Sequence, residues 1–112
     1  MFEIRNYYFK PELFEAYKSW ATAKALPYLK RELDLIGFWT NLPDAPQING
    51  QPMDNLGSAN ITWILQWKDM ASRNDTMAKV FQTPEWAEIF KDVPGGMPSY
   101  LRMEAKFAEQ IG

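Results

Sequence analysis

Near its C-terminus the chain reads Tyr100-Leu101-Arg102-Met103-Glu104-Ala105-Lys106-Phe107. Apolar and polar side chains alternate strictly along this segment, which is the period of a β-strand with one face on a core and the other face open. Hydrophobicity places Leu101, Met103, Ala105 and Phe107 on the core side. A sheet buried on only one face is typical of α+β domains, in which helices cover one side of an antiparallel sheet.

Three earlier segments, 2–9, 33–40 and 59–67, also have strand character. They are rich in β-branched and aromatic residues and lack helical spacing. Gly37 interrupts the second of them, which predicts a β-bulge or a close approach of backbone. The segment 41–57 contains so many Pro, Asn and Gly residues that no helix or central strand would tolerate it, and we predict a long loop there.

Helical patterns fill the remaining segments. Residues 11–26 have apolar side chains at three- and four-residue steps, and the helix can continue past Pro27 as a kinked turn. Asp69 is placed to cap a helix that starts at Met70, and Thr83-Pro84 has the features of a second helix start. The element order is therefore βαββαβ, a ferredoxin-like arrangement that forms one domain over residues 1–112.

The two faces of this sheet have different characters. On the predicted helix side, hydrophobicity places alternate residues of three strands: Phe2, Ile4, Asn6 and Tyr8; Ile61, Trp63, Leu65 and Trp67; and Leu101, Met103, Ala105 and Phe107. The opposite side mixes charges of both signs with aromatic rings, which suits a second sheet packed across it. We therefore predict a homodimer whose interface contains Glu3, Arg5, Tyr7, Tyr100, Arg102 and Glu104.

The overall composition excludes several classes of function. The chain has 112 residues, of which 46% are hydrophobic and 23% charged, and its net charge is −2, so nucleic acid and anionic membranes are poor partners. It contains no cysteine and no histidine, which excludes disulfides, thiolate nucleophiles, imidazole bases and Cys/His zinc sites. No apolar run is long enough for membrane insertion, and the charged N-terminus is unlike a signal peptide. These features predict a soluble, cytoplasmic protein.

Four short motifs give the chain a resemblance to a known family. They are Glu3-x-Arg5-x-Tyr7, Gly37-Phe38-Trp39, Gly57-x-x-Asn60 leading into Trp67-x-Asp69-Met70-x-x-Arg73, and Pro84-Glu85-Trp86. In this order, and on these elements, they resemble the NIPSNAP family of the dimeric α+β barrel superfamily. The resemblance implies a homodimer in which two sheets face each other and close a barrel.

The resemblance implies no definite reaction, because NIPSNAP proteins have no settled enzymatic activity. The wider superfamily includes cofactor-independent monooxygenases and heme-degrading enzymes, some of which use an Asn on the first strand together with a Trp. Asn6 matches the first of those residue types, but the absence of histidine removes the axial ligand that heme would need. Whether the chain is an enzyme stays open at this stage.

Aromatic residues define the candidate ligand site. Trp63 and Trp67 share one face of their strand, Tyr17 and Trp20 can reach that face from the first helix, and Asn6 is the one polar residue predicted there. An aromatic wall with a single amide suits a flat, weakly polar molecule. Core packing of the aromatic rings and a structural hydrogen bond from Asn6 are the plainer explanations.

Charged residues on the helices suggest no chemistry of their own. Arg73 is interpreted as the partner of Asp69 in an i,i+4 pair. Glu85, Glu88 and Asp92 share one helix face and are interpreted as solvated side chains, because a metal site needs ligands from more than one element. We therefore expect no metal and no other cofactor.

The leading hypothesis is a cytoplasmic homodimer that binds a small apolar or aromatic molecule in a cavity between sheet and helices. The alternatives are a cofactor-independent monooxygenase and a protein-interaction module without chemistry. A monooxygenase would need a base, and without histidine only Tyr, Lys or a carboxylate remains for that role.

Overall fold

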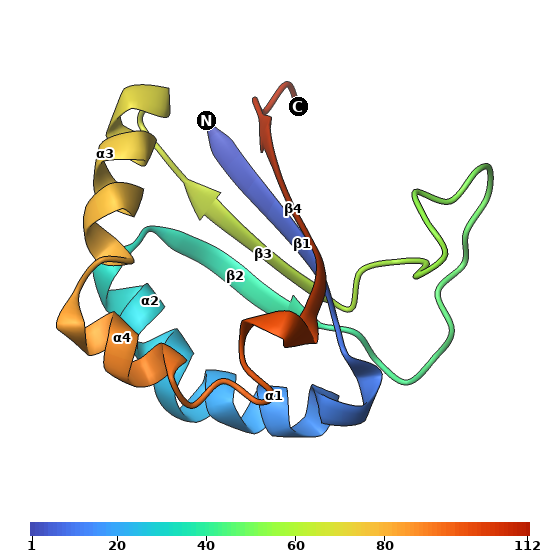
Figure 1. Ribbon diagram of the computed structural model, residues 1–112. Coiled ribbons are helices and arrows are strands. Elements are labelled where there is room, and N and C mark those ends of the chain that lie inside the picture. The colour runs from blue at the N-terminus through green and yellow to red at the C-terminus, as the bar shows by residue number, and fades with distance from the viewer.

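Four strands form one antiparallel sheet in the order β2-β3-β1-β4, in a computed structural model that describes residues 1–112 (Figure 1). Their bounds are β1 Phe2–Phe9, β2 Leu35–Thr40, β3 Ile61–Gln66 and β4 Tyr100–Ala108. β1 lies between β3 and β4 and is hydrogen-bonded to both. The two central strands, β3 and β1, therefore carry the side chains that face the helices at the middle of the sheet.

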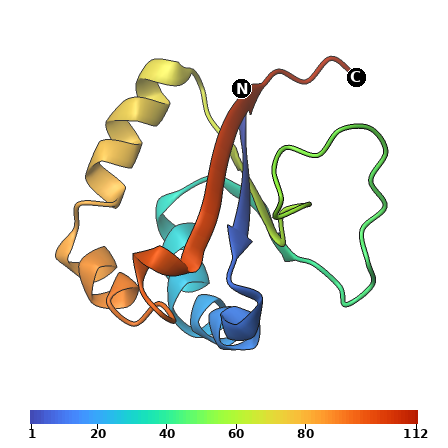
Figure 2. The same ribbon diagram turned by 45° about the vertical axis from the view of Figure 1, so that its right-hand side comes forward.

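The helical segments all lie on one side of this sheet, as Figure 2 shows. The first runs without a break through α1 (Phe14–Trp20), a π-helical turn (Ala21–Ala25) and α2 (Leu26–Glu32). α3 (Met70–Val80) and α4 (Pro84–Phe90) follow β3, and 3₁₀ turns precede α1 at Pro11–Leu13 and β4 at Met97–Ser99. None of these helices is long and apolar enough to cross a membrane.

The α+β fold class and the βαββαβ order predicted from the sequence are confirmed. Asp69 and Thr83 cap α3 and α4 as predicted, through bonds from Ser72 N and Trp86 N. Pro27 is built into the helix rather than ending it, and the wider π turn comes immediately before α2. Because a proline lacks an N–H and crowds the preceding turn, a local widening is a known way to retain it.

The β-bulge predicted at Gly37 is confirmed. The register of β2 against β3 shifts between Leu35 and Gly37, which is a β-bulge. A Cβ atom at Gly37 would lie 2.4 Å from the Trp39 ring, so only glycine lets that indole fold back onto the strand.

The predicted orientation of β1 was wrong. Glu3, Arg5 and Tyr7 pair directly with Leu65, Trp63 and Ile61, and directly paired residues share a face of the sheet. The three β3 residues are buried beneath the helices, so the odd-numbered residues of β1 face the helices too. Phe2, Ile4, Asn6 and Tyr8 consequently face the open side.

A second correction concerns the start of β4. The register between β1 and β4 shifts between Tyr8 and Phe9, so that Phe9 pairs with Tyr100. Tyr100 therefore packs against the core, while Leu101 is exposed. Met103, Ala105 and Phe107 are opposite Tyr7, Arg5 and Glu3, and they face the helices as predicted.

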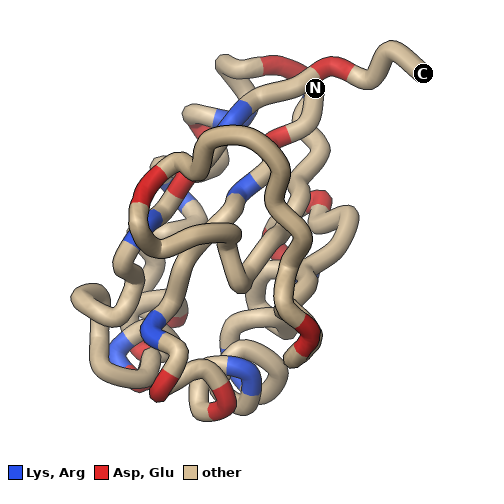
Figure 3. Tube along the Cα trace, turned by 90° about the vertical axis from the view of Figure 1, so that its right-hand side faces the viewer, with Lys and Arg blue, Asp and Glu red and all other residues tan.

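The loop between β2 and β3 lies on the open side of the sheet, opposite the helices (Figure 2). Arg102 on β4 holds it, since the guanidinium donates to Asp54 Oδ1 at 2.6 Å and to the Gly57 carbonyl at 2.8 Å. The charges of both signs are interspersed along the trace, with no large region of one sign (Figure 3). The long predicted loop is thus confirmed, and it is anchored at its returning end.

Candidate functional site

The strongest candidate site is a cavity of about 210 Å³ between the sheet and the helices. It is lined by three residues of the central strands, Arg5, Tyr7 and Trp63, and otherwise by Trp20, Ala25, Leu29, Phe81, Trp86, Phe90, Met97, Tyr100 and Met103. Arg5 is the single charged residue of this lining. The cavity is therefore an aromatic and aliphatic pocket with one polar wall, and it is partly open to solvent beside Met97 and Met103.

The polar wall is built by cross-strand pairing. Arg5 and Trp63 are directly opposite each other on β1 and β3, and Tyr7 follows two residues later on the same face. The Arg5 guanidinium carbon lies 5.1 Å from the Trp63 ring centre and 5.6 Å from the Tyr7 ring centre. Such cation–π contacts hold the guanidinium beside the two rings.

Glu3 stabilises this wall through hydrogen bonds and ion pairs. It is fully buried, and its Oε1 accepts from Arg73 Nε at 2.9 Å and from Trp67 Nε1 at 3.1 Å. Its Oε2 accepts from the second guanidinium nitrogen of Arg73 at 3.0 Å and lies 3.6 Å from Arg5. The hydrogen bond to Glu3 raises the pKa of Arg73. The interpretation of Arg73 as the partner of Asp69 was therefore wrong, because its side chain crosses from α3 to β1.

Two donors on the polar wall have no partner. Nε of Arg5 and Nε1 of Trp63 are buried and make no hydrogen bond. The Trp63 indole is close enough to the Tyr7 hydroxyl to lower its pKa slightly, but no hydrogen bond of normal geometry joins them. Buried N–H groups without acceptors are rare in folded proteins, and each needs an explanation.

Tyrosine ionisation is suppressed around the cavity. Burial raises the pKa of Tyr7 to about 12, against the smaller opposing effect of Arg5. Burial also raises the pKa of Tyr100 and, more strongly, of Tyr17, whose hydroxyl is close to that of Tyr100. At neutral pH all three side chains are therefore neutral hydroxyl groups that can donate a hydrogen bond.

The structure brings together only part of the predicted ligand site. Trp20 and Trp63 both line the cavity. Trp20 donates to the Ile89 carbonyl at 3.0 Å, which fixes α1 against α4. Tyr17 and Trp67 are buried beside the cavity, Tyr17 against the rings of Phe9 and Tyr100 and Trp67 on Glu3.

Asn6 lies on the opposite face of the sheet, as the corrected orientation of β1 requires. Its Oδ1 accepts from the Thr62 hydroxyl at 2.7 Å, and its Nδ2 donates to Glu104 at 3.4 Å. These hydrogen bonds give the Asn6 amide a structural role, which was the alternative to ligand binding. Asn6 is therefore separated by the sheet from Trp20 and Trp63.

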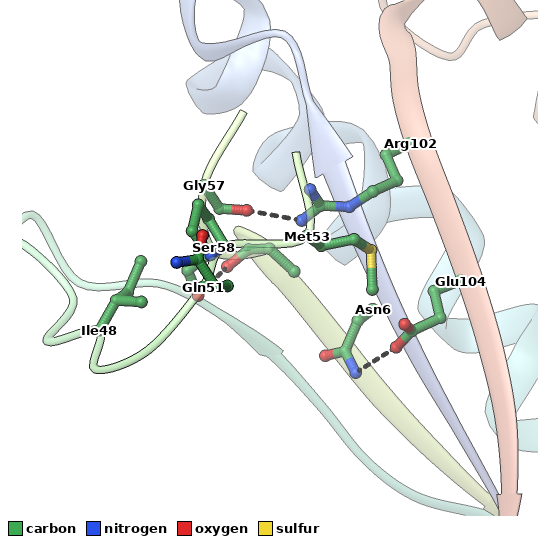
Figure 4. A pocket seen from close by; sticks show the side chains of 10 residues that line it. Asn6, Ile48, Gln51, Met53, Gly57, Ser58, Arg102 and Glu104 are labelled. Carbon is green, nitrogen blue, oxygen red and sulfur yellow. Dashed lines mark hydrogen bonds between the residues drawn. The ribbon is translucent and has the colours of Figure 1, made fainter. Parts of the chain in front are cut away.

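The predicted interface residues are divided between the two faces in the same way. Arg102 and Glu104 lie on the open face, where they line a hollow of about 340 Å³ beneath the loop (Figure 4). Glu3, Arg5, Tyr7 and Tyr100 point to the helix side instead. Although the hollow is larger than the cavity, its arginine is already paired with Asp54, and Glu104 accepts a hydrogen bond from Asn6. The cavity is the better candidate because its donors are free.

The acidic residues of α4 are each paired with a cation. Glu85 accepts from Arg31 and Asp92 from Lys24, both at 2.6 Å, and Glu88 pairs with Lys91. No group of three potential metal ligands is assembled anywhere in the chain. The three carboxylates form separate surface ion pairs.

Sequence reasoning missed most of the cavity wall. Arg5 and Tyr7 were placed on the wrong face, and Phe81, Trp86, Phe90 and Met97 come from segments whose approach to the sheet no local pattern reveals. One usable signal was present. The charged residues of the family motifs are Glu3, Arg5, Asp69, Arg73 and Glu85, and charges of both signs in one motif set suggest ion pairs among them.

Comparisons with known proteins agree with this architecture. The NIPSNAP family model matches residues 2–104. An uncharacterised NIPSNAP-like domain protein from Burkholderia xenovorans is 17% identical over 99% of this chain and 86% of that protein, with a TM-score of 0.73. A NIPSNAP family protein with unknown function from Agrobacterium tumefaciens is 18% identical over 94% and 82%, with a TM-score of 0.71.

A more distant structural relative is an enzyme. It is a 5-chloro-2-hydroxyhydroquinone dehydrochlorinase from Burkholderia phenoliruptrix, solved in complex with 2,5-dihydroxybenzoquinone. It is 10% identical over 97% of this chain and 94% of that protein, with a TM-score of 0.51. Among proteins of curated function, none matches the chain. At these identities the solved structures show a shared fold.

Proposed function

The chain belongs to the NIPSNAP family, and we propose that it is a homodimeric, cytoplasmic protein that binds a small aromatic molecule in the cavity between its sheet and its helices. The observation that carries this proposal is the cavity itself, an aromatic chamber that leaves two buried donors unpartnered. A close-packed interaction module would be expected to pair these buried donors, because buried N–H groups are rarely left without acceptors.

The volume of the cavity limits the size of the ligand. An apolar protein cavity of about 150 Å³ is known to hold benzene. A cavity of about 210 Å³ therefore has room for one ring with a substituent. Trp20, Trp86 and Phe90 offer faces and edges for such a ring, in contacts worth roughly 0.5–1.5 kcal/mol each beyond the burial of area.

The dimer part of the proposal is supported by the shape of the chain. Its radius of gyration is 14.7 Å, whereas a compact domain of roughly this length has about 13 Å. Helices cover one face of the sheet, while the other carries Phe2, Ile4, Tyr8 and Ile64 among charged residues. A second copy that covers this face would give each sheet two buried sides.

A cofactor-independent monooxygenase remains the alternative, and the distant dehydrochlorinase, whose complex holds a dihydroxybenzoquinone, favours considering it. Such an enzyme needs a base beside the acidic proton of its substrate. The titratable groups of the cavity wall are Arg5, Tyr7 and Tyr100, and burial raises the pKa of both tyrosines, which makes them poor proton acceptors near neutral pH. Binding is therefore favoured over this chemistry. Measurement of oxygen uptake after hydroquinones are added tests for monooxygenase activity.

Ligand binding is tested by filling the cavity. Ala25 lines it, and Ala23 lies two residues away in the same π turn but is exposed. Titration of the protein with toluene, followed by tryptophan fluorescence and NMR, should show saturable binding that Ala25→Leu abolishes and Ala23→Leu preserves. A wild-type protein that binds no small aromatic probe, or an Ala25→Leu variant that binds as the wild type does, would refute the proposal.

A further inference from the structure

The polar wall of the cavity has hydrogen-bond donors in excess. The Arg5 side chain lies no closer than 3.6 Å to Glu3, and its Nε is buried without a hydrogen-bond partner. Trp63, which is 4% exposed, also has a buried Nε1 without a partner. Tyr7 is the third residue of this wall, and its ring centre lies 6.1 Å from that of Trp63 and 5.6 Å from the Arg5 guanidinium carbon.

The three groups are alike in what they offer a ligand. An indole N–H is a donor only, and so is a guanidinium. Burial raises the pKa of Tyr7 to about 12, so its hydroxyl keeps its proton at neutral pH. The wall therefore presents hydrogen-bond donors, and a ligand that binds there must supply an acceptor. Oxygen is the common hydrogen-bond acceptor on a small aromatic molecule.

The charge of the wall adds a second requirement. Two guanidiniums, Arg5 and Arg73, share one carboxylate, Glu3. Both oxygens of Glu3 are engaged by Arg73 at 2.9 and 3.0 Å, while Arg5 is no closer to them than 3.6 Å. One positive charge is therefore left in excess at the edge of an apolar chamber, where a counter-ion is bound more strongly than in water.

We propose that Arg5, Tyr7 and Trp63 form a binding site for an anionic oxygen, and that the ligand of this cavity is a monoanion of one aromatic ring, such as an aromatic carboxylate or a phenolate. The ring lies among Trp20, Trp86 and Phe90, and its charged oxygen lies on the guanidinium of Arg5. This inference rests on the proposed function, since it names the class of ligand that the same cavity takes.

The role of Glu3 and Arg73 in this site is to position Arg5. Glu3 lies two residues before Arg5 on the same face of β1, and its bidentate bond with Arg73 keeps the carboxylate from turning fully to Arg5. The Arg73 guanidinium is in turn held over the Phe107 ring at 5.1 Å. Arg5 is thus oriented while its own donors stay free.

Four probes separate the ring from the charge. Toluene has the ring alone, benzamide adds a neutral oxygen, and benzoate and 4-nitrophenolate carry the two forms of anionic oxygen. In calorimetric titrations of the full-length protein, both anions or one of them should bind at least about tenfold more tightly than benzamide, the factor expected for a buried hydrogen bond to a charged group. The anion that binds more tightly identifies the source of the charge.

Three variants test the assigned residues. Arg5→Met keeps the length of the side chain and should reduce the affinity for the preferred anion about tenfold or more while toluene binding changes little. Tyr7→Phe removes only the hydroxyl, and Trp63→Phe removes the indole N–H while a smaller aromatic ring remains. Each variant lacks one donor, so each should cause a smaller loss for the anion. Arg102→Met is the matched control, because it removes the same charge from the open face and should leave all four probes unaffected.

The outcomes distinguish this inference from the proposal on which it rests. If toluene binds and neither anion binds more tightly than benzamide, the anion site is refuted and the aromatic cavity stands. If Arg102→Met weakens the anion as much as Arg5→Met does, the attraction is one of overall charge and the assigned site is wrong. If no probe binds, both proposals fail.

Discussion

At the scale of single residues, Glu3 explains how a charged strand can face a core. A fully buried carboxylate is tolerated only when its charge is paired and its oxygens are hydrogen-bonded. Glu3 meets both conditions through Arg73, Trp67 and the nearby Arg5. Removal of one partner of such a pair should lower the free energy of unfolding by more than the intact pair contributes to it.

We predict that Arg73→Met destabilises the fold by about 3 kcal/mol or more, because it leaves Glu3 buried without its bidentate partner. Urea denaturation should show a lower midpoint with little change in slope. Arg31→Met is the control, since Arg31 pairs with Glu85 on the exposed surface and its loss should change the midpoint little. Equal midpoints for the two variants would contradict the structural role of Glu3.

Tyr7 gives a prediction for alkaline pH. Its pKa is raised from 10 in the unfolded chain to about 12 in the folded protein. A raised pKa stabilises the fold fully below pH 10, and the contribution is lost as the pH rises toward 12; two pKa units correspond to roughly 3 kcal/mol. Tyr7→Phe removes this loss, so its free energy of unfolding should fall less between pH 9 and 12 than that of the wild type. Parallel curves for the two proteins would show that Tyr7 does not titrate this way.

At the scale of elements, the short helix α4 depends on Thr83, the residue that caps its N-terminus. Thr83 accepts from Trp86 N at 3.0 Å, and its hydroxyl lies 2.7 Å from that of Tyr28, which donates to the Val80 carbonyl. This network joins α2, the end of α3 and the start of α4. Because Trp86 and Phe90 of α4 line the cavity, the cap also sets the position of one cavity wall.

Thr83→Ala should destabilise the protein by about 1–2 kcal/mol, since it removes the cap and leaves the Tyr28 hydroxyl with one partner fewer. Thermal unfolding of the variant, with Thr83→Ser beside it, measures this effect. The serine variant keeps the hydroxyl and should remain close to the wild type. An equal loss in both variants would point to the methyl group rather than to the cap.

At the scale of the whole molecule, the sheet is covered by helices on one face and by the loop at one end of the other (Figure 2). The principal extents, 38 × 36 × 20 Å, describe a flat particle. Flat particles keep a large surface for their size, and small domains have little burial to spare. Self-association through the open face would supply the missing layer.

We therefore predict that light scattering gives about twice the chain mass of 13.0 kDa. Ile4 lies at the centre of the open face, paired with Ile64 and Lys106, so Ile4→Arg should place a second cation there and produce monomers. Ala78→Arg on the exposed side of α3 is the matched control and should remain dimeric. A monomeric wild type at micromolar concentration would refute the dimer.

The amino-acid sequence by itself determined the element types, their order and their caps. Those features depend on local chemistry, such as the turn formers of 41–57, the hydroxyl of Thr83 and the alternation of 100–107. The tertiary structure decided which face of β1 meets the helices. Alternation divides a strand into two sets, but hydrophobicity chose the set with Ile4 and Tyr8, because charges on Glu3 and Arg5 count against burial when each residue is judged alone. The pairing of Glu3 with Arg73, from an element 70 residues away, reverses that balance. The same distant contact turns Arg5 and Tyr7 into the cavity, and so the site exists only in the folded chain.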